Sequence, residues 1–311
     1  MCTRVSQPAL SESGLFSTLH RPARSGTAGS RHDATLGHCT PTDFRCDSFL
    51  ARTHCMRLLF LISILTGFST HDLFGTGKTA PALGDGETLT YRVAWAILPG
   101  AGEIQISAHQ EIGVEGPLLR VVTTTATRGL ARLLMPFEAR SESLFEARSG
   151  RLLSLHETNR NRGKTSEHTV IFDYGNGHAL YRVPEATEVR QLALPPGNPT
   201  DLITSLLQTR TWNLKPGEAR DALVLFNDDF YELTLHAENY EELRTSMGTY
   251  QTLLLVPRIE KTPPKGVFKQ GGTVRVWIAQ DAYHLPVRFE VEFKIGKGVA
   301  TLTGYQPPLG K

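Results

Sequence analysis

Six histidines in the body of the chain are the side chains best suited to acid–base chemistry or metal binding. No two of them stand at the His-x-His or His-x-x-x-His spacing that places two ligands on one element. Single histidines on strands or at the surface are commoner than convergent ones, so the sequence predicts no metal site and no cofactor. They are His109, His156, His168, His178, His236 and His284.

Nucleophiles and paired carboxylates give no stronger signal. All four cysteines precede Met56, so the rest of the chain cannot use a cysteine nucleophile. We find no Gly-x-Ser-x-Gly elbow, and no glycine-rich phosphate loop between a strand and a helix. The adjacent carboxylates Asp228-Asp229 and Glu241-Glu242 point to opposite faces wherever they lie in a strand. A hydrolase is therefore the weakest hypothesis, and we expect a protein that is not an enzyme.

Basic loops are more suggestive of a binding surface. One loop, 159–164, carries Arg160, Arg162 and Lys164, and a second carries Lys261, Lys265 and Lys269. Either loop has the charge to contact anionic lipid headgroups or a polyanionic wall, although solvated loops are the default interpretation. The formal net charge of +2 is too small to predict a nucleic-acid partner.

Alternating residues predict the strands that must position these side chains. Leu89, Tyr91, Val93, Trp95 and Ile97 share one face of a first strand, and Gly100 to Gly102 interrupt the pattern. Similar segments recur as far as residue 305, separated by turns rich in Gly, Asn and Asp. About a dozen strands predict a mainly β domain, an antiparallel meander forming a curved sheet, an open barrel or a sandwich.

Two short helices are expected to accompany the sheet. Residues 127–135 place Leu130, Leu133 and Leu134 on one side of the first helix. The second covers 199–210, with Asn198 as its cap, and its apolar stripe should plug or cover the core. That stripe consists of Leu202, Ile203, Leu206 and Leu207.

The first 84 residues predict export. Residues 1–55 have the composition of a disordered or misannotated extension. Residues 56–69 form a signal peptide, with Leu58 to Leu65 as its apolar run and cleavage near Ser69. That run is too short to span a bilayer, so no transmembrane anchor should remain after cleavage. Residues 70–84 are expected as a flexible leader and 85–308 as the β domain of a periplasmic or secreted protein.

Several short motifs resemble one family. They are Gly86 to Tyr91, Asp201-Leu202 with Arg210, Asp228 to Tyr231, Gly248 to Tyr250, Val276 to Asp281 and Leu285 to Val287. Over roughly residues 84–305 the chain is similar to the domain-of-unknown-function family 3108. The resemblance implies an exported bacterial protein, and it brings no established activity or catalytic residue.

These observations favour a binding or envelope-assembly module whose curved sheet holds an apolar or lipid-like molecule. We expect such a ligand to contact Trp95, Trp277, Tyr91 and Arg275. Trp277 shares a face with Arg275, where it either covers a second core layer or lines a cavity. The alternative is a purely structural domain that interacts with an envelope protein.

Overall fold

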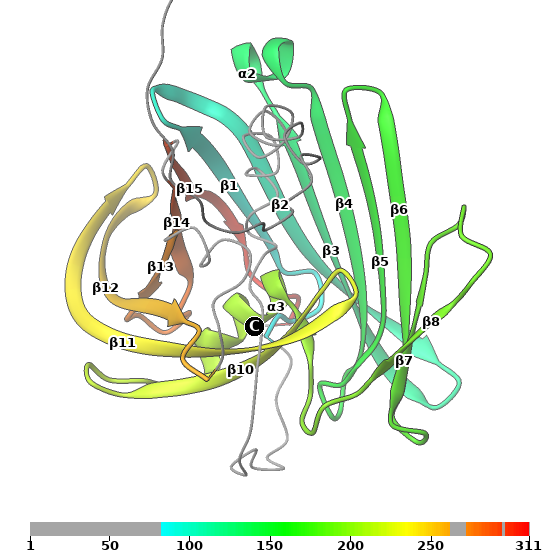
Figure 1. The fold of residues 1–311 in the computed structure, drawn as a ribbon. Helices are drawn as coiled ribbons and strands as arrows, with labels where there is room; N and C mark the ends of the chain where they lie inside the picture. The colour runs from blue at the N-terminus through cyan, green and yellow to red at the C-terminus, as the bar shows by residue number, and fades with distance from the viewer. Residues whose placement is uncertain (1–81, 262–271, 294–295, 311) are drawn as a thin grey trace, which may run out of the picture. The chain divides into compact units, whose positions relative to one another are not determined.

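The computed structural model describes residues 82–261, 272–293 and 296–310. Its strands form a single sheet of fifteen, in the order β8-β7-β6-β5-β4-β3-β2-β1-β15-β14-β13-β12-β11-β10-β9. Neighbouring strands are antiparallel except for β9, which runs parallel to β10. The first and last strands, β1 and β15, are therefore hydrogen-bonded neighbours in the middle of the sheet (Figure 1). The predicted antiparallel meander is confirmed.

The sheet consists of two wings that meet at β1 and β15. The first wing comprises β1 (Thr88–Trp95), β2 (Leu98–Gly113), β3 (Gly116–Thr127), β4 (Phe137–Glu146), β5 (Leu152–Asn161), β6 (Lys164–Asp173), β7 (His178–Arg182) and β8 (Arg190–Ala193). The second wing comprises β9 (Thr200–Asp201), β10 (Ala219–Phe226), β11 (Asp229–Thr245), β12 (Gly248–Arg258), β13 (Thr273–Ala279), β14 (Pro286–Phe293) and β15 (Gly296–Gln306).

The first hairpin turns earlier than its glycines predict. The turn lies at Ala96 and Ile97, where Ala96 adopts a positive φ of 49°, and β2 then runs through Gly100 to Gly102. Gly100 has a φ of 65°, and the register between β1 and β2 shifts after Val93. The expected break at Gly100 to Gly102 is therefore wrong, because Gly100 takes up an irregularity within the strand.

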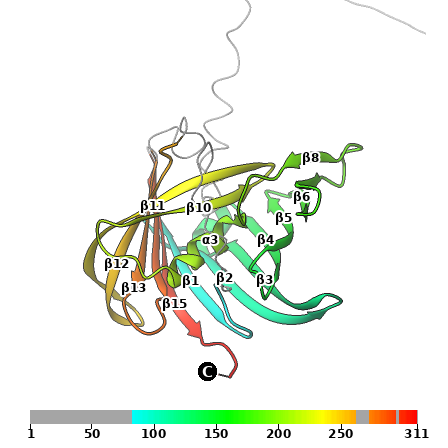
Figure 2. The same cartoon turned by 90° about the horizontal axis from the view of Figure 1, so that it is seen from below.

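The longer helix, α3 (Leu202–Gln208), begins later than expected, and the 3-10 turn η2 (Thr209–Thr211) continues it. Its cap is Asp201, whose side chain accepts a 2.9 Å hydrogen bond from the Thr204 backbone N–H, so the predicted cap at Asn198 is wrong. Thr200 and Asp201 pair with β10 as a strand, and this pairing delays the helix. The predicted apolar stripe of α3 is buried at Leu202, Leu206 and Leu207. Figure 2 shows α3 between β10 and the strands of the first wing.

The shorter helix, α2 (Gly129–Leu134), confirms the other helical prediction. Its three leucines share a side as expected, but that side faces solvent, and only Ala131 of this helix is buried. The reason is that α2 lies at one end of the sheet, beyond the strands whose inner face would cover it (Figure 1).

The core fills the concave face of the sheet, called here the inner face. One row of cross-strand neighbours runs from β1 to β12 over five adjacent strands, and all of its side chains are buried. The row consists of Val93, Ala300, Phe289, Val276 and Leu255. Burial of such rows on both wings supplies the main driving force for folding. The core also includes Ala82 and Leu83, at the end of the segment expected as a flexible leader. The rest of that leader, the predicted signal peptide and residues 1–55 lie outside the described residues.

Side chains join the two wings where the sheet is open. Ser143 of β4 donates a 2.8 Å hydrogen bond to Asp201, ahead of α3. Phe172 of β6 packs against Phe230 of β11 with ring centroids 6.3 Å apart. Arg190 of β8 forms an ion pair with Asp228, in the turn between β10 and β11. The curvature is thus fixed by contacts between the wings rather than by closure of a barrel.

Candidate functional site

The four side chains expected to contact a ligand lie in two pairs on opposite faces of the sheet. Tyr91 and Trp95 belong to the inner face, with Val93 between them in the alternation. Trp277 and Arg275 lie on the other face, because Val276 between them belongs to the buried inner row. The structure therefore places each pair on one face of the sheet but does not bring all four to one site.

Tyr91 and Trp95 both make structural contacts on the inner face. The Tyr91 side chain is fully buried, its hydroxyl donates a 2.8 Å hydrogen bond to the Pro286 carbonyl, and burial raises its pKa. The Trp95 ring lies against β15, where a Cβ added at Gly298 would come within 3.1 Å of it. Glycine at 298 thus leaves the room that the half-buried Trp95 ring occupies.

Trp277 and Arg275 belong to a charged network on the outer face. Trp277 is buried beneath the Arg288 guanidinium, which lies 5.2 Å from its ring centroid. Arg275 lies 3.2 Å from a carboxylate oxygen of the buried Glu290, and Lys297 lies 2.7 Å from the same carboxylate. These contacts satisfy the charge of Glu290. Trp277 itself is buried and belongs to the core, which favours its interpretation as packing.

A buried ion pair ties α3 to the strands below it. Arg210 lies in η2, and its Nη1 is 2.8 Å from an Oε1 of Glu87, just before β1. Arg210 also donates hydrogen bonds to the carbonyls of Ala82 and Tyr283. Glu87 accepts a further bond of 3.0 Å from the Tyr305 hydroxyl. This network gives Glu87 and Arg210, two positions in the motifs quoted for the family resemblance, a structural role.

A polar cluster interrupts the apolar inner face of the first wing. Glu157 of β5 and His168 of β6 are cross-strand partners, and an Oε2 of Glu157 lies 3.3 Å from the His168 Nε2. Burial and the nearby negative charge of Asp201 raise the pKa of Glu157 to about 7. A hydrogen bond from Ser141 acts in the opposite direction but is the smaller effect. Burial lowers the pKa of His168 to about 4. Both side chains are therefore uncharged between about pH 4 and pH 7.

The two pKa shifts act on stability with opposite signs. A raised pKa means that folded Glu157 keeps a proton that the unfolded chain has lost, so its contribution falls as pH rises from about 4.5 through 7. A lowered pKa means that folded His168 lacks a proton that the unfolded chain binds, so its contribution falls as pH drops from about 6.5 to 4. Between pH 4.5 and 6.5 the two slopes oppose each other.

The polar cluster does not have the geometry of a hydrolase. His156 and His168 cannot act together, because Glu157, the neighbour of His156 along β5, is the residue that faces His168. The Ser143 hydroxyl is committed to Asp201, whose other oxygen caps α3. Within the described ranges, no group of three or more His, Cys, Asp or Glu side chains is arranged to hold a metal ion.

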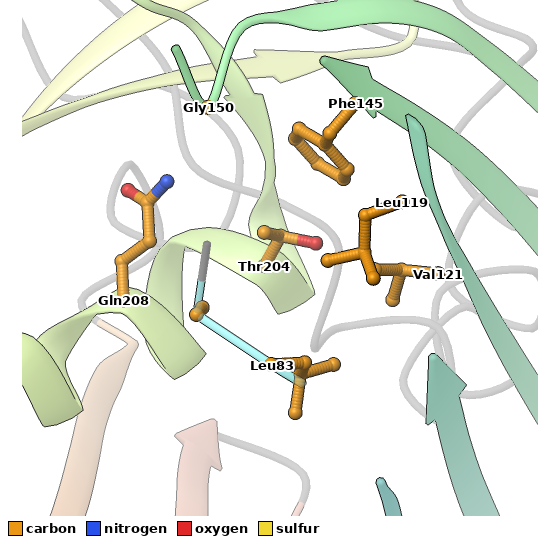
Figure 3. A pocket seen from close by; sticks show the side chains of 8 residues that line it. Leu83, Leu119, Val121, Phe145, Gly150, Thr204 and Gln208 are labelled. Carbon is orange, nitrogen blue, oxygen red and sulfur yellow. The ribbon is translucent and has the colours of Figure 1, made fainter. Parts of the chain in front are cut away.

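The space beside α3 is too small for a ligand. Figure 3 shows the cavity among Leu83, Leu119, Val121, Phe145, Gly150, Thr204 and Gln208, and its volume is about 10 Å³. A single water molecule needs roughly 10–15 Å³ by this measure. The apolar interior that the sequence suggested as a lipid site is therefore filled at α3, and the helix covers the core as expected.

A larger cavity lies at the end of the sheet that carries α2. Its volume is about 180 Å³, and it is called here the α2 pocket. The lining residues are Arg132, Pro136, Phe137, Glu138, Arg160, Arg162 and Gly163. Arg132 lies 2.6 Å from Glu138, whereas Arg160 and Arg162 form no ion pair with any residue in the described ranges. The pocket therefore carries three guanidinium groups against the single carboxylate of Glu138, which pairs with Arg132 and lies across the strand pair from Arg160.

The sequence pointed to one part of the α2 pocket and missed the other. The basic loop containing Arg160 and Arg162 stood out by its charge. The sequence did not show that Arg132 and Phe137 line the same pocket, because this depends on how the β5–β6 turn meets the start of β4. There the Arg162 N–H donates a 3.2 Å hydrogen bond to the Pro136 carbonyl. The second basic loop differs, because Lys261 is engaged by Asp221 and Glu232; Lys265 and Lys269 lie outside the described residues.

Comparisons with known proteins agree with the resemblance found in the sequence. The family described as "Protein of unknown function (DUF3108)" matches residues 90–303, from β1 to β15. The comparison with curated proteins finds no match. Within the part of the chain that the structure describes, no helix has the length and apolarity to cross a membrane.

Two solved structures are similar to this chain at low identity. One is a β-barrel-like protein of the domain of unknown function DUF1849 from Brucella abortus, with 7% identity and a TM-score of 0.46, covering 72% of this chain and 98% of that chain. The other, from Bacteroides fragilis, is described as a candidate exported protein with a YmcC-like fold. It has 10% identity and a TM-score of 0.29, covering 72% of this chain and 97% of that chain.

Proposed function

We propose that this chain, which belongs to the DUF3108 family of proteins of unknown function, is an exported, non-enzymatic binding module of the cell envelope. Its ligand is a lipid-like molecule whose anionic headgroup occupies the α2 pocket. The observation that carries the proposal is a cavity of about 180 Å³ lined by three arginines and one carboxylate, in which Arg160 and Arg162 form no ion pair with any described residue.

The α2 pocket has room for the headgroup of a lipid-like ligand but not for the whole molecule. Sites that enclose a drug-sized ligand measure roughly 300–1,000 Å³, so about 180 Å³ accommodates a headgroup and leaves an attached chain outside. A guanidinium group is suited to a phosphate because its planar donors match two phosphate oxygens. Phe137 and Pro136 add apolar surface to the pocket wall.

Export is the second part of the proposal, and it has independent support from the sequence. The positively charged start at Met56-Arg57 and the apolar run after it have the form of a secretory signal. An exported domain has access to the envelope lipids that would supply an anionic headgroup.

The test is titration calorimetry of the full-length protein with dihexanoyl phosphatidylglycerol, below its micelle concentration. We compare Arg160→Gln/Arg162→Gln with a matched double variant, Arg148→Gln/Arg182→Gln, whose exposed arginines lie outside the α2 pocket. Each arginine near an anionic lipid contributes about 1 kcal/mol, so the pocket variant should bind roughly thirtyfold more weakly.

The control variant should bind as tightly as the unmodified protein, and dihexanoyl phosphatidylcholine should bind far more weakly than the anionic lipid. Equal affinity of all three proteins for the anionic lipid, or absence of binding by the unmodified protein, would overturn the proposal. The structural alternative, a domain that only contacts an envelope protein, would then be the better interpretation.

A further inference from the structure

We infer that the end of the domain carrying α2 docks on the surface of an anionic lipid bilayer. This docking surface comprises the turn at Ala96-Ile97, α2 with the flanking Arg128, and the turn between β5 and β6. The inference rests on the proposed function only in that the arginines of the α2 pocket face the same headgroups.

Backbone contacts hold the three segments of the docking surface together. The Arg128 N–H donates a 2.8 Å hydrogen bond to the Ala101 carbonyl, which fixes the start of α2 against β2. The Arg162 N–H donates to the Pro136 carbonyl and so joins the β5–β6 turn to the chain that follows α2. Figure 1 shows α2 at the same end of the sheet as the turn between β1 and β2.

Large apolar side chains on this surface are exposed. Ile97 is 92% exposed, and on α2 the exposed fractions are 57% for Leu130, 82% for Leu133 and 59% for Leu134. Leaving such side chains in water forgoes the free energy of burying them. Exposed apolar side chains rimmed by polar ones mark surfaces that bind another molecule or a membrane.

Cations surround these apolar side chains. Five exposed cations lie on the docking surface, namely Arg128, Arg132, Arg160, Arg162 and Lys164. Two carboxylates pair with them, Glu103 with Arg128 and Glu138 with Arg132, which leaves a net charge of +3. Basic side chains around exposed leucines match the negative potential of an anionic leaflet.

The opposite end of the first hairpin lacks this complementarity. There, in and beside the turn between β2 and β3, Ile112 and Val114 are fully exposed, but the charged residues next to them in the chain are Glu111, which pairs with Arg120, and the exposed Glu115. A negative leaflet repels such a turn. Of the two ends of this hairpin, the α2 end is therefore the one that combines apolar side chains with an excess of positive charge.

The leucines of α2 favour a bilayer over a dissolved or wall-bound polyanion. A polyanion would contact the arginines and leave Leu133 and Leu134 in water. A bilayer offers headgroups to the cations and the acyl boundary to the leucines at the same depth. Because α2 has only six residues, its expected position is in the interface and not across the membrane.

The test is flotation of the full-length protein with vesicles of phosphatidylglycerol and phosphatidylcholine in equal parts. Leu133→Ser/Leu134→Ser should reduce the partition coefficient at least tenfold. The matched control Ile112→Ser/Val114→Ser, at the acidic turn, should leave it unchanged. Vesicles of phosphatidylcholine alone should bind the unmodified protein at least tenfold more weakly than the mixed vesicles.

The outcomes separate this inference from the proposed function. Binding of the short-chain lipid without binding to vesicles overturns docking and leaves the α2 pocket in place. Binding to vesicles without binding of the short-chain lipid overturns the pocket and leaves docking. Equal flotation of the leucine variant and the unmodified protein overturns docking. A dimer that the leucine variant dissociates would assign the leucines to a second copy of the chain and overturn it as well.

Discussion

Replacing Arg210 by Met should destabilise the domain strongly, because it leaves Glu87 buried without its cation. Only 3% of the Glu87 side chain is exposed, and the Arg210 Nη1 lies 2.8 Å from its carboxylate. Removing one partner of a buried pair costs about 3–5 kcal/mol. In a domain of roughly 220 residues, a loss of that size lowers Tm by about 6–20 °C.

A double-mutant cycle with Glu87→Gln identifies the cause of this loss. The combined variant contains no buried unpaired charge, so it should be more stable than Arg210→Met alone. We measure the free energy of unfolding by urea denaturation of the full-length protein under reducing conditions. Arg244→Met is the control, because its ion pair with Glu242 is exposed and worth at most about 1 kcal/mol. A loss below about 1 kcal/mol for Arg210→Met, or additive losses in the double variant, would refute the reasoning.

Two further substitutions test buried polar contacts beside α3 and on the inner face of the sheet. Glu157→Gln should stabilise the protein more at pH 8 than at pH 4, by on the order of 3 kcal/mol, because it removes an ionisation that burial disfavours. The free energy of unfolding in urea is measured at both pH values, and an equal effect of the substitution at each would contradict the raised pKa of Glu157. Asp201→Ala should lower the free energy of unfolding by about 2–4 kcal/mol, because it removes the cap of α3 and leaves the Ser143 hydroxyl unpaired. In a protein that already carries Ser143→Ala, the same substitution should lower the free energy of unfolding by less.

The fold was predictable from sequence wherever a local pattern determines structure. Alternation identified β1 from Leu89 onward, and the apolar stripe identified α3, because both depend on short-range spacing. The start of α3 could not be located in this way, since it is delayed by pairing of Thr200 and Asp201 with β10. The side of α2 that meets solvent was equally hidden, because it depends on where the sheet ends.

The candidate site was less predictable than the fold. The charge of Arg160 and Arg162 marked one loop, but the pocket also needs Arg132 from the other side of β4. Aromatic residues were a poor guide, since Tyr91 and Trp277 are large side chains that the fold uses for packing. A resemblance in strands and turns identifies a family without indicating which surface of the protein binds a ligand.

The adjacency of β1 and β15 makes completion of the sheet depend on a strand that is synthesised long after its partner. Thr88 pairs with Gln306 and Trp95 with Gly298, contacts of very high sequence separation that slow folding. Until β15 arrives, β1 and β14 both present unpaired backbone edges that invite pairing with other chains. An emerging chain of this topology stays incompletely folded until β15 has been synthesised, and during that time its open strand edges expose it to aggregation.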